Sequence, residues 1–230
     1  MPATESTARN NYRFYLCSNP NCTLRFPAPI LFDSDSLPCP RCQSPARPIH
    51  TPEEVADHNP RQERSPDVPH IEVLLDNIRS TFNVGAMLRT ADGAGVSHVH
   101  LAGITPLPTH AKIAKVALGA EFAVPWTHHA NGLNAVQECK DRGLQILGLE
   151  IQSDAISIFD AASTLLDQPT LLVVGNEVSG IDPGIQELCD RNIWIPMQGY
   201  KRSLNVAVAF GIAVYTLRYG VPTVLPLKNA

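Results

Sequence analysis

The sequence predicts an α/β protein in which helices cover both faces of a mostly parallel β-sheet, preceded by a small cysteine-bearing segment. From Ile71 onward, short apolar runs rich in β-branched residues alternate with segments of helical periodicity, which is the pattern of parallel sheets. Before Ile71 the chain holds 12 of its 20 prolines and four of its six cysteines, with little periodicity. A separate, loop-rich unit is therefore expected there.

The elements of the larger unit follow from periodicity and from residues that stop helices. The apolar runs at 144–149 and 171–174 are continuous enough for fully buried strands, and Gly143 stands where the preceding helix would end. Strands are predicted at residues 71–75, 98–101, 122–126, 144–149, 171–174 and 192–195. Helices are predicted at residues 83–94, 111–118, 134–142 and 204–219.

Length and composition bound the organisation of the chain. Its 230 residues, 44% hydrophobic and 17% charged, suffice for one packed domain and a small appendage. We divide it into a zinc-ribbon-like segment with a frayed N-terminus at 1–48, a linker at 49–69 and the α/β domain at 70–230. The net charge of −4 means that any RNA binding requires a local basic patch. With no apolar run long enough for a membrane span and no signal-peptide pattern, we expect a soluble, cytoplasmic protein.

Four cysteines in the first segment have the spacing of metal ligands. Cys17 and Cys22 form one pair, Cys39 and Cys42 a second, and 16 residues separate the pairs. Zinc prefers four tetrahedral thiolates, and so short a segment has too little core to fold without such a staple. We predict structural zinc, the alternatives being free thiols or disulfides. Four cysteines leave no open position for a catalytic metal.

The remaining cysteines, histidines and aromatic residues have plainer interpretations. Cys139 and Cys189 fall in helical segments and are expected to be buried and inert. The eight histidines lack metal-ligand spacing and are interpreted as surface or capping residues. Four aromatic residues near the first cysteines could stack on RNA bases or fill the small core of the segment, and for most of them we favour the core. They are Tyr12, Phe14, Tyr15 and Phe26.

Three blocks in the larger unit carry the functional prediction. They are NIRSTFNVGAMLRTA at 77–91, VGNEVSG at 174–180, and IPM at 195–197 followed by SLNVA at 203–207. In this order and spacing they resemble the signature motifs of the SpoU branch of the SPOUT methyltransferases, over roughly residues 70–225. The segment KVALGAE at 115–121 is similar to a further family segment. The α/β domain is therefore identified as a SpoU-type methyltransferase domain.

The resemblance implies an enzyme that methylates a ribose 2′-hydroxyl of tRNA or rRNA with S-adenosylmethionine. Such a reaction requires alignment of the two reactants and assistance in deprotonating the hydroxyl. The arginine of the first motif matches Arg89. An arginine is almost never neutral, so clamping an RNA phosphate is its easier role. The catalytic residues implied are Arg89, Asn83, Glu177, Ser203 and Asn205.

The same resemblance implies the binding residues and the assembly. Glycines after a strand would let the cofactor approach the main chain. The cofactor residues implied are Val174, Gly175, Asn176, Glu177, Gly180, Ile195, Met197, Ser203, Leu204 and Asn205. Candidate RNA contacts are Arg79, Lys115, Lys201 and Arg202. The family also implies a C-terminal trefoil knot, which periodicity could not reveal, and a homodimer.

Simpler roles compete with several of these assignments. Asn83 and Ser203 are good N-caps for the helices that follow them, and Arg89 could pair with Asp92 one turn away. Two other functions also compete. One is a non-catalytic RNA-binding protein on the same scaffold, for which the acidic net charge leaves room. The other is methylation of a base instead of a ribose.

Overall fold

The computed structural model describes residues 12–30, 36–51, 69–161 and 168–220, and the chain divides into two compact units, 1–63 and 64–230. The frayed N-terminus and most of the linker predicted at 49–69 lie outside the described residues. Within the described ranges, every helix is too short or too polar to cross a membrane.

The first unit is a four-stranded antiparallel sheet with the strand order β2-β1-β4-β3. Its core holds Tyr15, which is 2% exposed and stacks on Phe26 at a centroid distance of 6.0 Å. Apart from Phe26, most of the residues that pair with β1 are prolines and arginines. The strands are β1 (Tyr12–Cys17), β2 (Arg25–Pro29), β3 (Leu37–Pro38) and β4 (Pro45–His50).

The second unit confirms the predicted fold class. Its sheet has the order β7-β6-β5-β10-β8-β11-β9, and every pair in it is parallel. The strands are β5 (Ile71–Asp76), β6 (His98–Ala102), β7 (Trp126–His129), β8 (Gln145–Leu149), β9 (Ile156–Ser157), β10 (Thr170–Val174) and β11 (Arg191–Trp194). The helices are α2 (Thr81–Gly93), α3 (Ala111–Ala117), α4 (Ala120–Ala123), α5 (Gly132–Asp141), α6 (Ile158–Ala161), α7 (Pro183–Leu188) and α8 (Val206–Tyr219).

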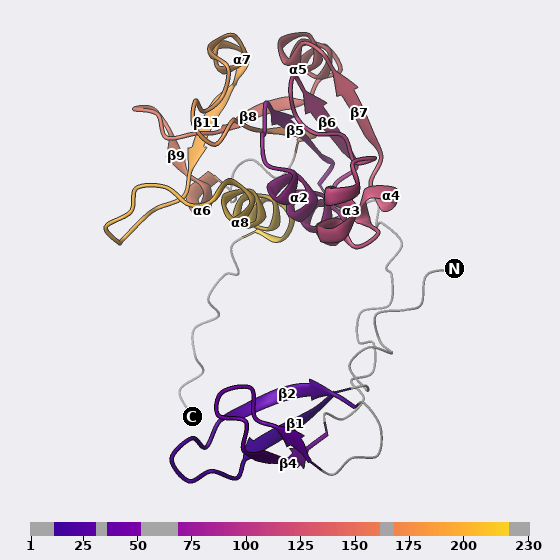
Figure 1. Ribbon diagram of the computed structural model, residues 1–230. Coiled ribbons are helices and arrows are strands. Elements are labelled where there is room, and N and C mark those ends of the chain that lie inside the picture. Colours follow the sequence, from indigo (N-terminus) through magenta and orange to yellow (C-terminus); the bar gives the residue numbers. More distant parts are fainter. Residues whose placement is uncertain (1–11, 31–35, 52–68, 162–167, 221–230) are drawn as a thin grey trace, which may run out of the picture. The chain divides into compact units, whose positions relative to one another are not determined.

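Helices cover both faces of this sheet (Figure 1). On one face, α2, α3 and α8 pack on a core that includes Val73, Leu75 and Phe210. On the other, α5 and α7 pack on a second core that includes Leu74 and Val136. Strand β5 supplies both cores because neighbouring side chains of a strand point to opposite faces. Its even-numbered side chains on the α5 face also include Glu72 and Asp76, both buried.

One predicted strand is wrong. Residues 120–123 form the short helix α4, and the strand β7 begins later, at Trp126. Gly119 has a φ of +98°, a conformation that favours glycine, and its N–H donates to the Glu121 carboxylate at 2.9 Å. This local turn starts a helix within an otherwise strand-like sequence. The short elements β9, α6 and α7 were also not predicted.

Neither of the two helix caps considered as simpler roles for site residues is formed. Ser80, and not Asn83, caps α2: its hydroxyl accepts the N–H of Asn83 at 3.3 Å. Asn205, and not Ser203, caps α8, with its side-chain oxygen accepting the N–H of Ala207 at 2.9 Å. Asn83 and Ser203 thereby have side chains that are not used in starting a helix.

Candidate functional site

The carboxyl ends of the neighbouring parallel strands β5 and β10 bring the first two sequence motifs together. The loop after β5 begins at Asn77, whose carbonyl oxygen accepts the amide of Asn176, from the loop after β10, at 2.6 Å. The hydroxyl of Thr105 bonds to the main chain of both Ile78 and Leu75, which anchors the first loop on the sheet. The edge at which ligands of open α/β sheets bind is therefore built from these motifs.

Glu177 joins the two loops through its carboxylate. It accepts the N–H groups of Arg79 at 3.0 Å and Ser80 at 3.2 Å, and the side-chain amide of Asn83 at 2.9 Å. Burial alone would raise the pKa of Glu177, but the hydrogen bonds from Arg79, Asn83 and Ser80 outweigh it and lower the pKa. The carboxylate is thus held ionised and fixed in position.

Asn83 extends this connection to the third motif. Its side-chain oxygen accepts the amide of Asn205 at 3.2 Å, while Asn205 also caps α8. Asn83 is 7% exposed, so its amide is a buried group with partners on both sides. Glu177, Asn83 and Asn205, separated by up to 122 residues in the sequence, form one hydrogen-bonded chain.

A cavity of about 400 Å³ lies beside this chain. Its walls come from the carboxyl ends of β8, β10 and β11 and from the loop before α8, and this volume is typical of a small-molecule site. All ten residues that the sequence motifs assign to the cofactor line it. They are Val174, Gly175, Asn176, Glu177, Gly180, Ile195, Met197, Ser203, Leu204 and Asn205.

Gly175 and Gly180 of the second motif are needed for the shape of their loop, a role that was not predicted from the sequence. A Cβ on Gly175 would lie 2.3 Å from main-chain atoms of Gly180 and Ile181, so the loop could not close on itself. Gly180 has a φ of +76°, and its main chain pairs with Asn176 in both directions. Both glycines line the cavity, but each is required first for the shape of the loop.

The basic residues predicted for the site divide into two groups. Arg202 lines the cavity, and Lys201 precedes it on an exposed loop. Arg79, Arg89 and Lys115 are exposed but are not among the residues that line the cavity. Asn83 bonds to two residues that line the cavity, Glu177 and Asn205.

Sequence reasoning missed several residues of the cavity wall. Glu150, directly after β8, bonds through its carboxylate to the N–H of Ile181 at 3.3 Å and of Ile151 at 3.2 Å. Trp194 ends β11 and also lines the cavity. Their positions at the carboxyl ends of two predicted strands were the available signal, because that edge is where α/β sheets bind ligands.

The four N-terminal cysteines form a compact cluster in the first unit. Their sulfur atoms all lie within 4.8 Å of one another, with Cys17 and Cys42 at 3.4 Å and Cys22 and Cys39 at 3.8 Å. Four thiolates around zinc at about 2.3 Å would stand about 3.8 Å apart. Hydrogen bonds from Ser44 lower the pKa of Cys42 to about 6, whereas burial raises the pKa of Cys17 to about 12, so the distances are what support a metal. The set therefore fits a tetrahedral metal ion.

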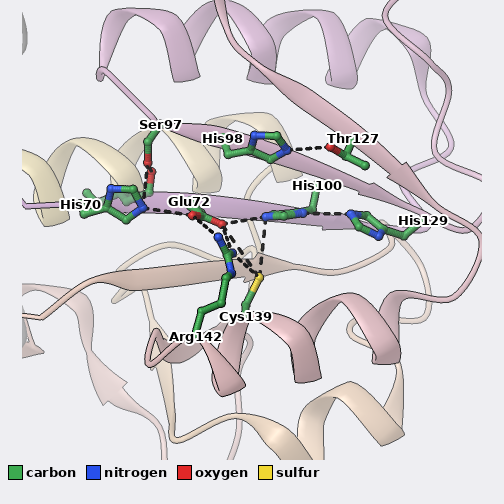
Figure 2. A network of polar contacts seen from close by, with 10 residues as sticks. His70, Glu72, Ser97, His98, His100, Thr127, His129, Cys139 and Arg142 are labelled. Carbon is green, nitrogen blue, oxygen red and sulfur yellow. Dashed lines mark hydrogen bonds and ion pairs between the residues drawn. The ribbon is translucent and has the colours of Figure 1, made fainter.

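A second polar cluster lies under the sheet, between β5, β6 and α5 (Figure 2). The carboxylate of Glu72 pairs with Arg142 at 2.6 Å, His100 at 2.8 Å and His70 at 3.0 Å. Cys139 is buried as predicted, but its sulfur accepts from Arg142 at 3.1 Å. The interpretation of the histidines as surface or capping residues holds for His110, which caps α3, and is wrong for the buried His100.

Three side chains of this second cluster are of the metal-ligating kind, but their arrangement does not suit a metal ion. The Arg142 guanidinium already lies against both Glu72 and Cys139, so a cation occupies the point at which a metal would bind. Glu72 is the second residue of β5, whereas the cavity lies beyond the other end of the strands. We assign the cluster a structural role.

Comparison with known proteins agrees with the site. The profile of the SpoU rRNA Methylase family matches residues 70–215. A tRNA (guanosine(18)-2′-O)-methyltransferase of Aquifex aeolicus is 35% identical over 147 residues, which cover 62% of this chain and 66% of that protein. The 23S rRNA (guanosine(2553)-2′-O)-methyltransferase RlmP of Bacillus subtilis is 35% identical over 146 residues, covering 64% and 57%. The chain thus spans less than two thirds of the length of these relatives.

Solved structures are similar over the same region. An AdoMet-bound rRNA methyltransferase from Sinorhizobium meliloti has a TM-score of 0.60 at 28% identity, covering 66% of this chain and 57% of that one. The TrmH/SpoU tRNA modifying enzyme of A. aeolicus has a TM-score of 0.58 at 33% identity, covering 66% and 75%. With the family profile matching more than half of its length and the motifs assembled at one cavity, the chain belongs to the SpoU rRNA Methylase family.

Proposed function

We propose that this protein transfers a methyl group from S-adenosylmethionine to a ribose 2′-hydroxyl of a tRNA or rRNA. The observation that carries the proposal is the chain Glu177–Asn83–Asn205, which ties all three motifs to one cavity of small-molecule size. The two curated relatives described above are named as guanosine 2′-O-methyltransferases, one of tRNA and one of 23S rRNA. A guanosine is accordingly the first acceptor to test.

The cavity suits S-adenosylmethionine in its chemistry. Ile195, Met197 and Leu204 give apolar surface for the adenosyl group, and the loop at Gly175–Gly180 offers main-chain polar groups. When bound, the cofactor supplies an activated methyl group. The protein would hold the cofactor in this cavity and orient it toward the acceptor.

The acceptor is positioned by the residues at the mouth of the site. Asn205 and Ser203 offer polar groups beside the cavity, and Glu177 keeps Asn83, and through it Asn205, in one orientation. Lys201 and Arg202, both exposed, would pair with RNA phosphates, and so would the exposed Arg89. In this proposal Arg89 assists the 2′-hydroxyl by holding a phosphate next to it.

The assembly and location are also part of the proposal. A homodimer would cover apolar side chains that α8 leaves exposed, among them Val208, Tyr215 and Tyr219. The trefoil knot remains a prediction from the family resemblance. We also propose a cytoplasmic location, which a tRNA or rRNA substrate supports.

Incubation with methyl-labelled S-adenosylmethionine and unmodified total tRNA or rRNA, followed by nucleoside digestion, tests the function. We expect label in a 2′-O-methylnucleoside of one RNA class. Label in a methylated base would replace ribose transfer by base methylation. No transfer to either pool with cofactor binding intact would point to a missing substrate context, such as a ribosome precursor. RNA binding with neither transfer nor cofactor binding would favour the non-catalytic alternative.

We also propose that zinc occupies the cluster Cys17, Cys22, Cys39 and Cys42. The support is the mutual distance of the four sulfurs and the lack of any disulfide among them. Each pair sits in a similar turn, with the residue after its second cysteine, Thr23 or Gln43, at positive φ. Zinc would here fix the ends of the four strands and take no part in transfer.

Cys39→Ser is expected to remove zinc from the purified protein, because three thiolates bind it far more weakly than four. Metal analysis should find one zinc per wild-type chain and much less in the variant. The second unit should keep its unfolding transition, which tryptophan fluorescence follows because Trp126 and Trp194 both lie there. Cys189→Ser is the matched control and should keep its zinc. A wild-type protein purified without stoichiometric zinc would contradict the assignment.

A further inference from the structure

The four-stranded sheet of the first unit has one face that its core does not use. Along β1, Tyr15 and Cys17 are buried at 2% and 3% exposure, whereas Tyr12 and Phe14 point the other way and are exposed at 43% and 36%. The aromatic residues near the cysteines therefore divide into two pairs. Tyr15 and Phe26 fill the core, as favoured from the sequence, but Tyr12 and Phe14 do not.

Two arginines flank this exposed face. Leu16 lies on the same face of β1 as Phe14, and it pairs with Arg25 of β2 on one side and with Arg47 of β4 on the other. Residues directly opposite in antiparallel strands share a face, so both guanidinium groups border the row Tyr12, Phe14 and Leu16. Both arginines are exposed. We call these five residues the outer face.

Charge around the outer face is of one sign. Residues 12–30 and 36–51 contain four arginines and no aspartate or glutamate. The acidic residues Asp33 and Asp35 lie in the segment between them, outside the described residues. A chain whose net charge is −4 thus has a local cationic surface with aromatic rings at its centre.

We propose that the outer face binds a single-stranded segment of the RNA substrate, with bases stacked on Tyr12 and Phe14 and phosphates paired with Arg25 and Arg47. Exposed aromatic rings on the middle strand of a sheet, bordered by cations, are the combination that single-stranded nucleic acid requires. A protein partner could pack on the rings, but it would not require the two arginines, Arg25 and Arg47, that border them. The identity of the RNA as substrate depends on the proposed methyl transfer.

The test measures binding of full-length, zinc-loaded protein to a fluorescent single-stranded RNA of about ten nucleotides. Tyr12→Ser combined with Phe14→Ser should weaken binding about tenfold or more, since each stacked base contributes substantially. Tyr12→Phe combined with Phe14→Tyr preserves the rings and should bind like the wild type. Arg25→Gln with Arg47→Gln should reduce the dependence of log K on log salt by about 1.4, the value for two phosphates of a single strand.

Control measurements separate the possible failures. Zinc content reports whether each variant keeps a folded first unit, and Arg191→Gln, an exposed arginine of the second unit, should change neither affinity nor salt dependence. Unchanged RNA affinity in both double variants, or no binding by the wild type, would overturn the proposal. If the wild-type protein transfers methyl groups and the variants keep the same KM for RNA, RNA binding by the outer face is refuted and the proposed methyl transfer stands. If the wild type transfers no methyl group to any RNA, the proposed function itself is refuted.

Discussion

Arg89→Ala is expected to reduce methyl transfer about 10²–10³-fold while leaving the affinity for S-adenosylmethionine unchanged. Arg89 is exposed on α2 and is not among the residues that line the cavity, so its loss should not disturb the cofactor. Its proposed task is to clamp a phosphate of the acceptor RNA, and that contact matters when the hydroxyl and the methyl group must be aligned.

Single-turnover assays measure the rate of methyl transfer, and calorimetry measures the affinity for S-adenosylmethionine. Arg89→Lys keeps the charge but loses the planar fork, so it should fall between wild type and the alanine variant. Arg191→Ala removes an exposed arginine at the start of β11 that does not line the cavity, and it should have no effect. Wild-type turnover by Arg89→Ala would refute the assignment, and loss of cofactor affinity would mean that Arg89 acts on the pocket.

The candidate site was largely predictable because it lies in contiguous motifs. The ten residues assigned to the cofactor all line one cavity, although periodicity gave no information on how the loops after β10 and β11 meet. Glu150 was not predicted because no motif includes it. It reaches the site only through the parallel pairing of β8 with β10 and β11, which is a property of the assembled sheet.

The errors in the fold concern choices that are made locally by the main chain. Ser80 and Asn83 are both suitable caps, as are Ser203 and Asn205, and composition cannot decide which residue lies at the first turn. Once Ser80 caps α2, the side chain of Asn83 is released to bond with Glu177 and Asn205. The misplaced cap therefore concealed the interaction that unites the site.

Glu72 was missed for a different reason. Strand β5 was predicted correctly, but one carboxylate in an apolar run gives no indication of its partners. Those partners come from β6 and from the end of α5, up to 70 residues away. The second cluster is thus a product of tertiary structure alone, and its energetic importance can be tested directly.

Glu72→Gln is expected to lower the free energy of unfolding of the second unit by about 2–4 kcal/mol. The Glu72 side chain is 5% exposed and accepts from Arg142 and His100, both of which would lose a charged partner. Urea denaturation followed by tryptophan fluorescence measures the change. Glu138→Gln neutralises an exposed glutamate of α5 and is the matched control. A midpoint in the Glu72 variant equal to that of the wild type would contradict the structural role.

The same cluster predicts how stability changes with pH. Burial alone would lower the pKa of His100, but hydrogen bonds with Cys139 and Glu72 raise it to about 9. A raised histidine pKa stabilises the fold fully below its unfolded value of 6.5, and this contribution is lost as pH rises from there to about 9. Burial would raise the pKa of Glu72, but hydrogen bonds from His100, Arg142 and His70 lower it, so its contribution is present above its ordinary pKa of 4.5 and lost in acid.

The cluster should therefore stabilise the fold most between about pH 4.5 and 6.5, and lose on the order of 2–3 kcal/mol by about pH 9. His100→Asn removes the titrating group and should flatten the alkaline decline while lowering stability at pH 6. His98→Asn, on the same strand but bonded to Thr127 instead of Glu72, should keep the decline. His100→Asn lacks the charged pair with Glu72. If its stability still declined with alkaline pH as in the wild type, other groups would be responsible for the decline.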